Sequence, residues 1–428
     1  MGGALSRRDF GKALGLAGAG VAAPALLAGC SSGSARSARA AAANGAANTW
    51  QVTGKALASL GAFDTTMKGF MQSRDITCGQ LAVVRNGKLV LSRGYTWNVS
   101  TAPVTQPTSL FRIASVSKPI TATAVLRLVQ DGKLKLTDRP ATLLGLSTAA
   151  DPRLEDVTVL RLLQHLGGWD REISPDPVFA DWVISQGYGK PLPISQADIM
   201  RYASAQKLDH APGSTYAYAN YGYTLLGQII EKITGQEYAD YVQRTVLAPL
   251  DIQRMRLGAS RASGTGEVEY DSDRIVTTIL DSSGKKVPAP YGLFNLENLD
   301  SAAGWTATAM DLTRFVGVYE GGTSVLNTAS IERALAEPET GVSADGWYYG
   351  CGWQVRSYSG GRMNIWHSGS LAGTYSMLVR RTGGLTWAVL FNQRPEDDAP
   401  DYDIDTRLLE TSKTVQTWPT GDLTSTYF

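Results

Sequence analysis

The sequence predicts a mixed α/β (α+β) fold in which strands from both ends of the chain form one antiparallel sheet around a mostly helical middle. Near the N-terminal end, Asn86-Gly87 separates two β-rich runs within residues 79–95. Asn-Gly between apolar runs is the strongest short-range signal of a β-hairpin. A comparable pair of runs, Gly373–Arg381 and Leu385–Phe391, lies near the C-terminal end.

The middle of the chain shows helical patterns instead. Residues 221–234 have apolar side chains at helical spacing, and Gly235 follows them as a typical helix end. Residues 154–165 are also expected to be helical. Residues 260–300 are polar and rich in glycine, so their structure is the hardest to predict.

Composition narrows the function classes. The chain has 428 residues, enough for one large domain or two smaller ones, and its formal net charge of +1 gives no electrostatic case for binding nucleic acid. Three scattered histidines without paired-ligand spacing predict no metal site, and no cofactor is indicated. Cys78 and Cys351 could form a disulfide or stay buried as small apolar side chains.

The N-terminal segment predicts export. Paired arginines at 7 and 8, followed by an apolar run, resemble a twin-arginine signal, and Leu27-Ala28-Gly29-Cys30 resembles a bacterial lipobox. We therefore divide the chain into a signal (1–30), a flexible tether (31–49) and one large folded domain (50–428). A lipid on Cys30 would anchor the protein on the outer face of the cell membrane. Plain cleavage and secretion is the alternative.

The first candidate for chemistry is Ser115, with Lys118 three residues later. In a helix these positions share one face, so the amine can lie beside the hydroxyl. A serine at a helix start also has a backbone N–H available for developing negative charge. Ser-x-x-Lys occurs four times here, from Ser115, Ser204, Ser282 and Ser283, but only the first copy enters an amphipathic helix. The alternative is a helix-capping serine with a surface lysine.

A second candidate stretch contains Tyr218 and Asn220. Tyrosine could act as a base if Lys118 favours its phenolate, which requires a fall of about three pKa units, or about 4 kcal/mol. Asn220 offers both a donor and an acceptor to a substrate carbonyl or amide. A structural cluster of aromatic side chains is the alternative.

A third stretch, Trp366-His367-Ser368-Gly369-Ser370, precedes the C-terminal strands. Gly369 allows close approach of the backbone, and the Ser370 N–H could be an oxyanion donor. His367 could donate to the leaving group or bind a substrate carbonyl. The alternative is a histidine whose hydrogen bonds are satisfied within a strand turn.

Taken in order, Ser-x-x-Lys, Tyr-x-Asn and His-x-Gly resemble the serine hydrolases of the penicillin-recognising, β-lactamase/transpeptidase-like fold. That group includes class C β-lactamases, family VIII esterases, D-aminopeptidases and D-alanyl-D-alanine carboxypeptidases. The resemblance extends over residues 79–392 and includes the stretches at 157–165, 212–220, 302–312 and 349–353.

The resemblance implies a sheet flanked by helices, with a helical region at about 115–300 inserted and the site between them. Ser115 would be the nucleophile, Lys118 and Tyr218 would share the general-base role, and Asn220, His367 and Gly369 would contact substrate. The N–H groups of Ser115 and Ser370 would form the oxyanion hole.

Two departures from the group's pattern matter. His367 replaces a lysine that pairs with a substrate carboxylate in β-lactamases, which favours an esterase or D-aminopeptidase. Leu166-Gly167-Gly168 stands where many relatives have Thr-Ser-Gly, so we expect the contacts of this loop to differ from those in the group.

The expected function is an exported serine hydrolase that acts through an acyl-enzyme on a carboxylic ester, a small amide or a peptide. A class C β-lactamase, or a penicillin-binding lipoprotein with little turnover, is the first alternative. A second is a hydrolase with a Ser/His/Asp triad that pairs Ser115 with His165, His210 or His367.

Overall fold

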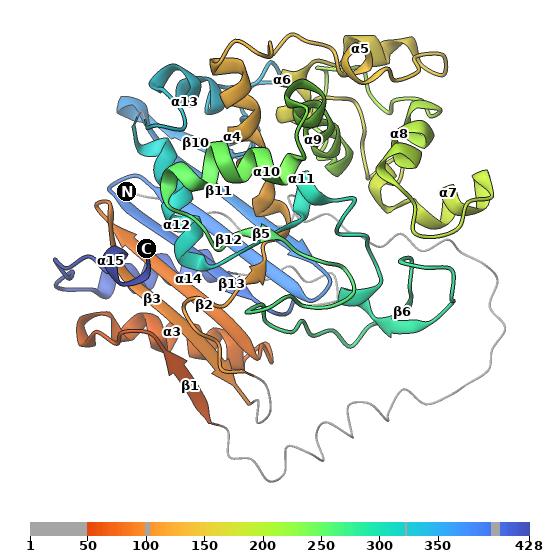
Figure 1. Cartoon of the computed structure of the whole chain (residues 1–428). Coiled ribbons are helices and arrows are strands. Elements are labelled where there is room, and N and C mark those ends of the chain that lie inside the picture. The colour runs from red at the N-terminus through yellow and green to blue at the C-terminus, as the bar shows by residue number, and fades with distance from the viewer. Residues whose placement is uncertain (1–48, 99–102, 322, 395–402) are drawn as a thin grey trace.

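A large antiparallel sheet dominates the fold. The computed structural model describes residues 49–98, 103–321, 323–394 and 403–428. Within these ranges eight strands form one sheet in the order β1-β3-β2-β13-β12-β11-β10-β9 (Figure 1). Their bounds are β1 Trp50–Thr53, β2 Cys78–Arg85, β3 Lys88–Trp97, β9 Tyr348–Tyr349, β10 Gln354–Tyr358, β11 Arg362–Leu371, β12 Thr374–Arg381 and β13 Leu385–Phe391. The proposed signal, Cys30 and nearly all of the tether lie outside the described residues.

The two ends of the chain meet in the middle of this sheet. β13 pairs with β2 in antiparallel register, from Leu385 opposite Arg85 to Phe391 opposite Gly79. The predicted hairpins are confirmed: β2 and β3 are joined by Asn86 and Gly87, both with positive φ, as a tight hairpin turn requires. One sheet from both ends of the chain therefore agrees with the sequence prediction.

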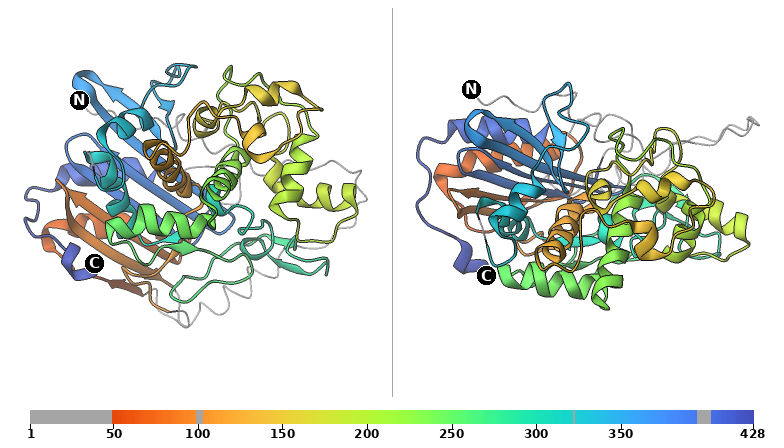
Figure 2. Two further views of the ribbon diagram at one scale, coloured as in Figure 1. Left: turned by 45° about the horizontal axis from the view of Figure 1, so that its top comes forward. Right: turned by 90° about the horizontal axis from the view of Figure 1, so that it is seen from above.

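Helices cover both faces of the sheet (Figure 2). Side chains along β13 alternate between two cores. Trp387, Val389 and Phe391 pack in the smaller core, which also contains helices α3 (Gly61–Gln72) and α14 (Ile404–Thr414). Ala388 and Leu390 pack in the larger core on the opposite face. Because both faces are covered, every residue of β13 is buried.

The larger core holds most of the other helices. The helices of the described residues outside α3 and α14 are α4 Ser117–Gln130, α5 Pro140–Leu144, α6 Val159–Leu163, α7 Asp181–Tyr188, α8 Gln196–Ser204, α9 Asn220–Thr234, α10 Tyr238–Val242, α11 Asp300–Ala303, α12 Ala309–Val316, α13 Thr328–Ala334 and α15 Thr424–Tyr427. The predicted helix at 221–234 is confirmed as α9, and Gly235 ends it with φ 67°. The continuous helix expected at 154–165 is wrong.

That segment is split by an extended link. A 3-10 turn, Pro152–Asp156, ends before Val157, and Thr158 has extended dihedral angles. The Thr158 side chain accepts a hydrogen bond from the Arg161 N–H and so starts the short helix α6 as its N-cap. Capping at Thr158 therefore favours two short elements over one helix.

The glycine-rich region contains small strands. Strands β4 (Phe111–Arg112), β8 (Trp305–Ala307) and β5 (Arg256–Leu257) form a three-stranded sheet, and β6 (Ile275–Thr277) pairs with β7 (Lys286–Pro288). Arg112 is fully buried, and its guanidinium donates to the carbonyls of Pro290 and Ala259. It also lies 3.6 Å from a Glu267 carboxylate oxygen. This arginine therefore ties the glycine-rich region to the strand that precedes Ser115.

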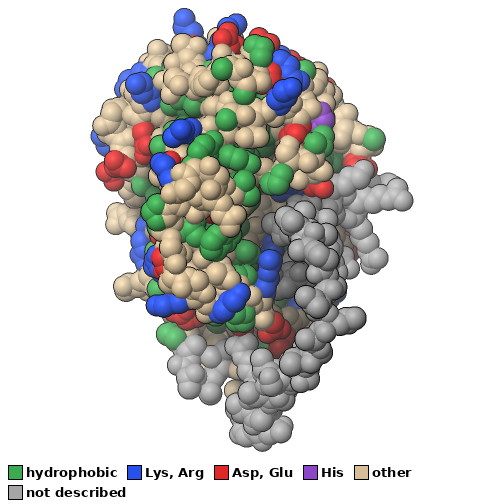
Figure 3. Space-filling view, turned by 90° about the vertical axis from the view of Figure 1, so that its right-hand side faces the viewer, with side chains coloured by type: hydrophobic (Ala, Val, Ile, Leu, Met, Phe, Trp, Pro, Cys, Tyr) green, Lys and Arg blue, Asp and Glu red, His purple; other side chains and the backbone are tan. Residues whose placement is uncertain are grey.

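The surface over α7 is unusually apolar. Hydrophobic side chains gather on the face shown in Figure 3. Among the described residues six large hydrophobic side chains are exposed, and four of them, Ile173, Phe179, Trp182 and Val183, lie in one stretch. In the described ranges no helix combines the length and apolar character needed to span a membrane. Cys78 and Cys351 are both buried free thiols.

Candidate active site

Ser115 lies on a turn that opens toward solvent within a buried segment. The turn is a 3-10 helix, Ala114–Val116, which leads directly into α4. From Leu110 to Leu126, Ser115 is the only residue that is not buried. The prediction that a helix begins around Ser115 is confirmed, with the regular α-helix starting at Ser117. Ala114 has φ 44°, and this left-handed backbone prevents a regular helix from extending back past Ser115.

Lys118 is in contact with Ser115, as the spacing predicts. Its Nζ lies 3.1 Å from the Ser115 Oγ, 2.7 Å from the Asn220 Oδ1 and 2.9 Å from the Ala302 carbonyl oxygen. The side chain is 0% exposed, which excludes the alternative of a surface lysine. The Lys118 amine thus connects the first turn of α4 to the start of α9 and to α11.

The environment of Lys118 favours its neutral form. Burial lowers the pKa of this amine well below 10.5, an effect that the charge of Asp176 opposes and that of Arg171 supports. A neutral amine has two N–H donors and one lone pair. The two carbonyl oxygens can take the donors, which leaves the lone pair facing the Ser115 hydroxyl. Lys118 is therefore placed to accept the serine proton.

Asn220 is held by a carboxylate that the sequence analysis missed. Asp176 accepts hydrogen bonds from the Asn220 side-chain Nδ2, at 3.1 Å, and from the backbone N–H groups of Asn220 and Tyr221, at 2.6 and 3.2 Å. It thereby caps the N-terminus of α9 from a distant loop. Burial raises the pKa of Asp176, and its hydrogen bonds to Asn220 and Val178 lower it. This contact fixes which way the Asn220 amide points.

Tyr218 lies beside the serine and the lysine. Lys118 Nζ is 4.8 Å from the centroid of its ring, and its hydroxyl oxygen is buried. The two hydroxyls are near enough for Ser115 to lower the pKa of Tyr218, although they do not meet hydrogen-bond geometry. Burial outweighs this effect and raises the pKa of Tyr218 well above 10. Burial therefore disfavours the phenolate in the free protein, and the base role of Tyr218 stays a prediction.

The aromatic cluster considered as an alternative is also present. The ring centroids of His165 and Tyr218 are 4.2 Å apart, those of His165 and Tyr349 are 4.5 Å apart, and those of Tyr216 and Tyr349 are 5.9 Å apart. These rings form a wall around the site. The cluster and the serine contact are compatible, because the ring of Tyr218 takes part in the wall while its hydroxyl lies by Ser115.

Gly369 places strand β11 against the nucleophile's turn. A Cβ at Gly369 would lie 2.2 Å from the Ile113 carbonyl oxygen and 3.0 Å from the Ser115 backbone nitrogen. Only glycine allows this approach. Ser370 follows and is partly exposed, and its Oγ accepts a hydrogen bond from Arg394 at 3.0 Å. Oxyanion roles for the N–H groups of Ser115 and Ser370 stay predictions.

His367 matches the alternative of a satisfied histidine. Its Nδ1 lies 2.6 Å from the Ser368 carbonyl oxygen and its Nε2 lies 2.8 Å from the Tyr349 hydroxyl. Burial lowers the pKa of His367 to about 3, so the ring is neutral. Nδ1–H therefore donates to the carbonyl, and Nε2 accepts from Tyr349. With both nitrogens engaged, His367 has no proton for a leaving group.

A Ser/His/Asp triad is not formed. His165 accepts a hydrogen bond from the Ala219 N–H, and His210 pairs with Asp170 at 2.8 Å. Neither of these histidines, nor His367, contacts the Ser115 hydroxyl in the described structure. This geometry excludes the triad arrangement for the free protein.

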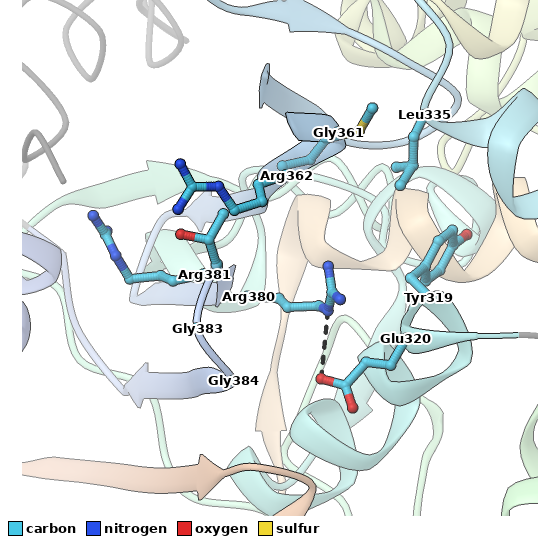
Figure 4. Close-up of a pocket in the computed structure, with 11 residues that line it drawn as sticks. Tyr319, Glu320, Leu335, Gly361, Arg362, Arg380, Arg381, Gly383 and Gly384 are labelled. Atoms are coloured by element: carbon cyan, nitrogen blue, oxygen red, sulfur yellow. Dashed lines mark hydrogen bonds and ion pairs between the residues drawn. The ribbon is translucent and has the colours of Figure 1, made fainter. Parts of the chain in front are cut away.

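A separate cavity lies at the far hairpins of the sheet, with a volume of about 360 Å³ (Figure 4). Two of its three arginines are in ion pairs, Arg380 with Glu320 at 3.4 Å and Arg381 with the buried Asp405 at 3.2 Å, and the third, Arg362, donates to the Ser359 carbonyl at 3.2 Å. Ser115 and its neighbours do not line it. Within the described ranges, no group of three or more His, Cys, Asp or Glu side chains is arranged to hold a metal ion.

Fold and site together define a β-lactamase-type serine hydrolase architecture. The family model described as Beta-lactamase matches residues 63–411. Because this match includes most of the sequence, the chain belongs to that family.

Three known proteins illustrate the likeness. Protein flp of Staphylococcus aureus (strain COL) is 26% identical over 294 residues, which are 67% of this chain and 55% of that protein. The chain thus spans about half the length of this relative. The octameric penicillin-binding protein homologue from Pyrococcus abyssi has TM-score 0.63 and 23% identity, and the match covers 82% of this chain and 77% of that one. D-amino acid amidase from Ochrobactrum anthropi SV3 has TM-score 0.61 and 20% identity, with 82% and 98% covered. These two structures show the fold and confirm the predicted fold class.

Proposed function

We propose that the protein is an exported serine hydrolase that forms an acyl-enzyme at Ser115 and hydrolyses a carboxylic ester or a small amide. The contact of 3.1 Å between the Ser115 hydroxyl and the buried amine of Lys118 supports this proposal most directly. Burial lowers the pKa of that amine and so favours its neutral form, which is a proton acceptor.

The proposed reaction has two halves. The Ser115 oxygen attacks the substrate carbonyl as its proton moves to Lys118, and the oxyanion is held by the N–H groups of Ser115 and Ser370. The leaving group departs with a proton that returns from Lys118 by way of the neutral Tyr218 hydroxyl. Water then attacks the acyl-enzyme, gives its proton to the same base and releases the acid and free Ser115.

Amides of D-amino acids are candidate substrates. The structural neighbour from Ochrobactrum anthropi is called a D-amino acid amidase, and its structure was solved with D-phenylalanine. The neutral His367 offers no charge to a substrate carboxylate at the third motif, which favours an esterase or amidase over a β-lactamase.

Covalent labelling tests the proposal. The full chain and its Ser115→Ala variant are treated with a fluorophosphonate, and the modified residue is located by mass spectrometry. We expect one adduct on Ser115 and none on the variant. Steady turnover of p-nitrophenyl esters or D-amino acid amides supports a hydrolase, whereas a burst without turnover, or rapid β-lactam cleavage, supports the alternative functions. Labelling of another serine refutes the proposal.

We also propose that the protein is exported and anchored by a lipid at Cys30. The proposal rests on the paired arginines at 7 and 8 and on the sequence Leu27–Cys30. Metabolic labelling with a tagged fatty acid should mark the wild type and leave Cys30→Ser unmarked in the same cells. Equal labelling of both proteins would show that Cys30 is not the site of lipid attachment.

A further inference from the structure

Two guanidinium groups, those of Arg171 and Arg394, lie near the reacting groups, and that of Arg394 donates to the Ser370 Oγ at 3.0 Å. Burial lowers the pKa of Lys118, His165 and His367, which disfavours a positive charge on each of these three bases. Arg171 carries the permanent positive charge of a guanidinium. Its Cζ lies 5.0 Å from the centroid of the Tyr218 ring. The guanidinium is thus next to the residue that lies beside Ser115.

The hydrogen-bonding capacity of Arg171 is largely unused. A guanidinium has five N–H donors. Throughout the described ranges the structure shows no hydrogen bond from Arg171, and its one ion pair is a long contact of 3.7 Å to its neighbour Glu172. The Arg171 side chain is 19% exposed and that of Glu172 is 60% exposed. A small anion can therefore reach the guanidinium without displacing a buried partner.

The backbone around Arg171 is held in place. The preceding Asp170 accepts from the Glu172 N–H at 2.9 Å and pairs with His210 at 2.8 Å. Asp209 accepts from the Asp170 N–H at 2.8 Å and also from the Ser174 hydroxyl. These bonds fix a tight turn from 170 to 174. The guanidinium is therefore presented from an ordered turn, which reduces the entropy lost when it binds an anion.

We propose that Arg171 binds a carboxylate of the substrate and makes this site selective for acidic esters or amides. The proposal rests on the hydrolase function proposed above and adds the substrate class. A planar guanidinium binds a carboxylate through two parallel hydrogen bonds. The Arg171 guanidinium and the Lys118 amine lie 5.0 and 4.8 Å from the centroid of the same Tyr218 ring, so a carboxylate bound to Arg171 would lie a few bonds from the carbonyl under attack. The buried Asp176 is tied to α9 and Glu172 points to solvent, so neither occupies the anion position.

Matched substrates test the proposal on the full chain. The pair p-nitrophenyl hydrogen adipate and its methyl ester places or removes a carboxylate on the acyl side. The pair 3-carboxyphenyl butyrate and its methyl ester does the same on the leaving-group side. The measured quantity is charge preference, which is kcat/KM for the acid divided by kcat/KM for the methyl ester, after subtraction of the uncatalysed rate.

The wild type should prefer the acid in at least one pair, and Arg171→Gln should reduce that preference about tenfold, as expected for the loss of one charge-assisted pair. Arg171→Lys should keep part of it, and added salt should weaken it in the wild type. The matched control is Arg201→Gln, because the Arg201 guanidinium also lies 5.0 Å from a tyrosine ring, that of Tyr188, and should leave the preference unchanged.

Three results would overturn the proposal. The first is a wild type with no charge preference in either pair, and the second is an Arg171→Gln variant with the same charge preference as the wild type. The third is an Arg171→Gln variant that loses kcat/KM equally for acid and methyl ester and has a shifted pH profile, which would mean that Arg171 acts only through the pKa of Tyr218. Fluorophosphonate labelling of Ser115 in Arg171→Gln separates the two proposals. If labelling persists, the hydrolase proposal stands whatever happens to the charge preference.

Discussion

Lys118 illustrates how burial changes the chemistry of a residue. A lysine in water is a cation, but this one is 0% exposed and meets two carbonyl oxygens and one hydroxyl. The positive charges nearby favour its neutral form as well, since Arg171 lowers its pKa. Burial therefore shifts Lys118 toward the neutral form that the proposed role of proton acceptor requires.

Replacing Lys118 separates charge from basicity. Arginine keeps a positive charge but cannot give up its proton, and methionine has neither charge nor basicity. We expect Lys118→Arg and Lys118→Met to lose kcat/KM for p-nitrophenyl esters to a similar extent, about 10²- to 10⁴-fold. An exposed lysine in a turn gives the control Lys133→Arg, which should retain full activity. An active Lys118→Arg enzyme would show that the charge, not proton acceptance, matters.

Sequence patterns identified some of these residues and missed others for a physical reason. Ser115 and Lys118 are three residues apart, so local geometry alone predicts their contact. Asp176 and Arg171 have no such pattern. Asp176 acquires its role only when the loop before α7 folds onto the start of α9, which is 44 residues away. Contacts of this kind depend on the tertiary fold, and periodicity does not reveal them.

Among the elements, α9 is capped at its N-terminus by a residue from a distant part of the chain. Its preceding residue, Ala219, has no side-chain cap, and Asp176 takes that place. Asp176→Asn removes the charge and replaces one acceptor oxygen with a donor. We expect a loss of about 3–5 kcal/mol in the free energy of unfolding, the range for breaking a buried charge interaction, and a lower kcat because Asn220 is released.

Urea unfolding and ester kinetics on the same samples measure both effects of Asp176→Asn. Asp198, a position in the first turn of α8 whose side chain is 13% exposed and pairs with the more exposed Lys190, supplies Asp198→Asn as a control. That variant should lose less than about 1 kcal/mol and no activity, since surface pairs contribute little. Equal destabilisation by the two changes would contradict the cap role.

Helices and hairpins were predicted correctly where the residues of a turn or helix end are characteristic. Asn86-Gly87 and Gly235 have the positive φ angles that their turns require, so the hairpin and the end of α9 follow from the sequence. The helix expected at 154–165 was misplaced. Thr158 caps a new helix inside that segment, as threonine is suited to do, but the helical pattern of the flanking residues hides the break.

In the whole molecule, titratable groups buried in the native state link stability to pH. The pKa of His367 is about 3 in the native protein and near 6.5 in an unfolded chain. Between these values the unfolded chain binds more protons, so stability falls as the pH decreases from 6.5 toward 3. His165, whose pKa burial also lowers, acts in the same direction.

Buried acids act in the opposite direction. Burial raises the pKa of Asp181, Asp300 and Asp405 to about 6, against 3.8 in an unfolded chain. Their native forms bind protons more readily, so these three groups add stability as the pH falls from about 6 to 3.8. The acid sensitivity of the wild type alone therefore reports a sum of opposing effects. A difference between two variants is needed to isolate one group.

His367→Gln provides that difference, because all the buried acids are present in both proteins and cancel. The free energy of unfolding of the wild type minus that of the variant should decrease by about 1.4 kcal/mol per pH unit below 6.5, or about 3 kcal/mol between pH 6 and pH 4. Above pH 7 the difference should be constant, because His367 is neutral in both states there. Urea titrations at pH 4, 5, 6, 7 and 8 measure it. A constant difference down to pH 4 would mean that His367 titrates alike in the native and unfolded states, and that its ring is not shielded by Tyr349 and the neighbouring aromatic wall.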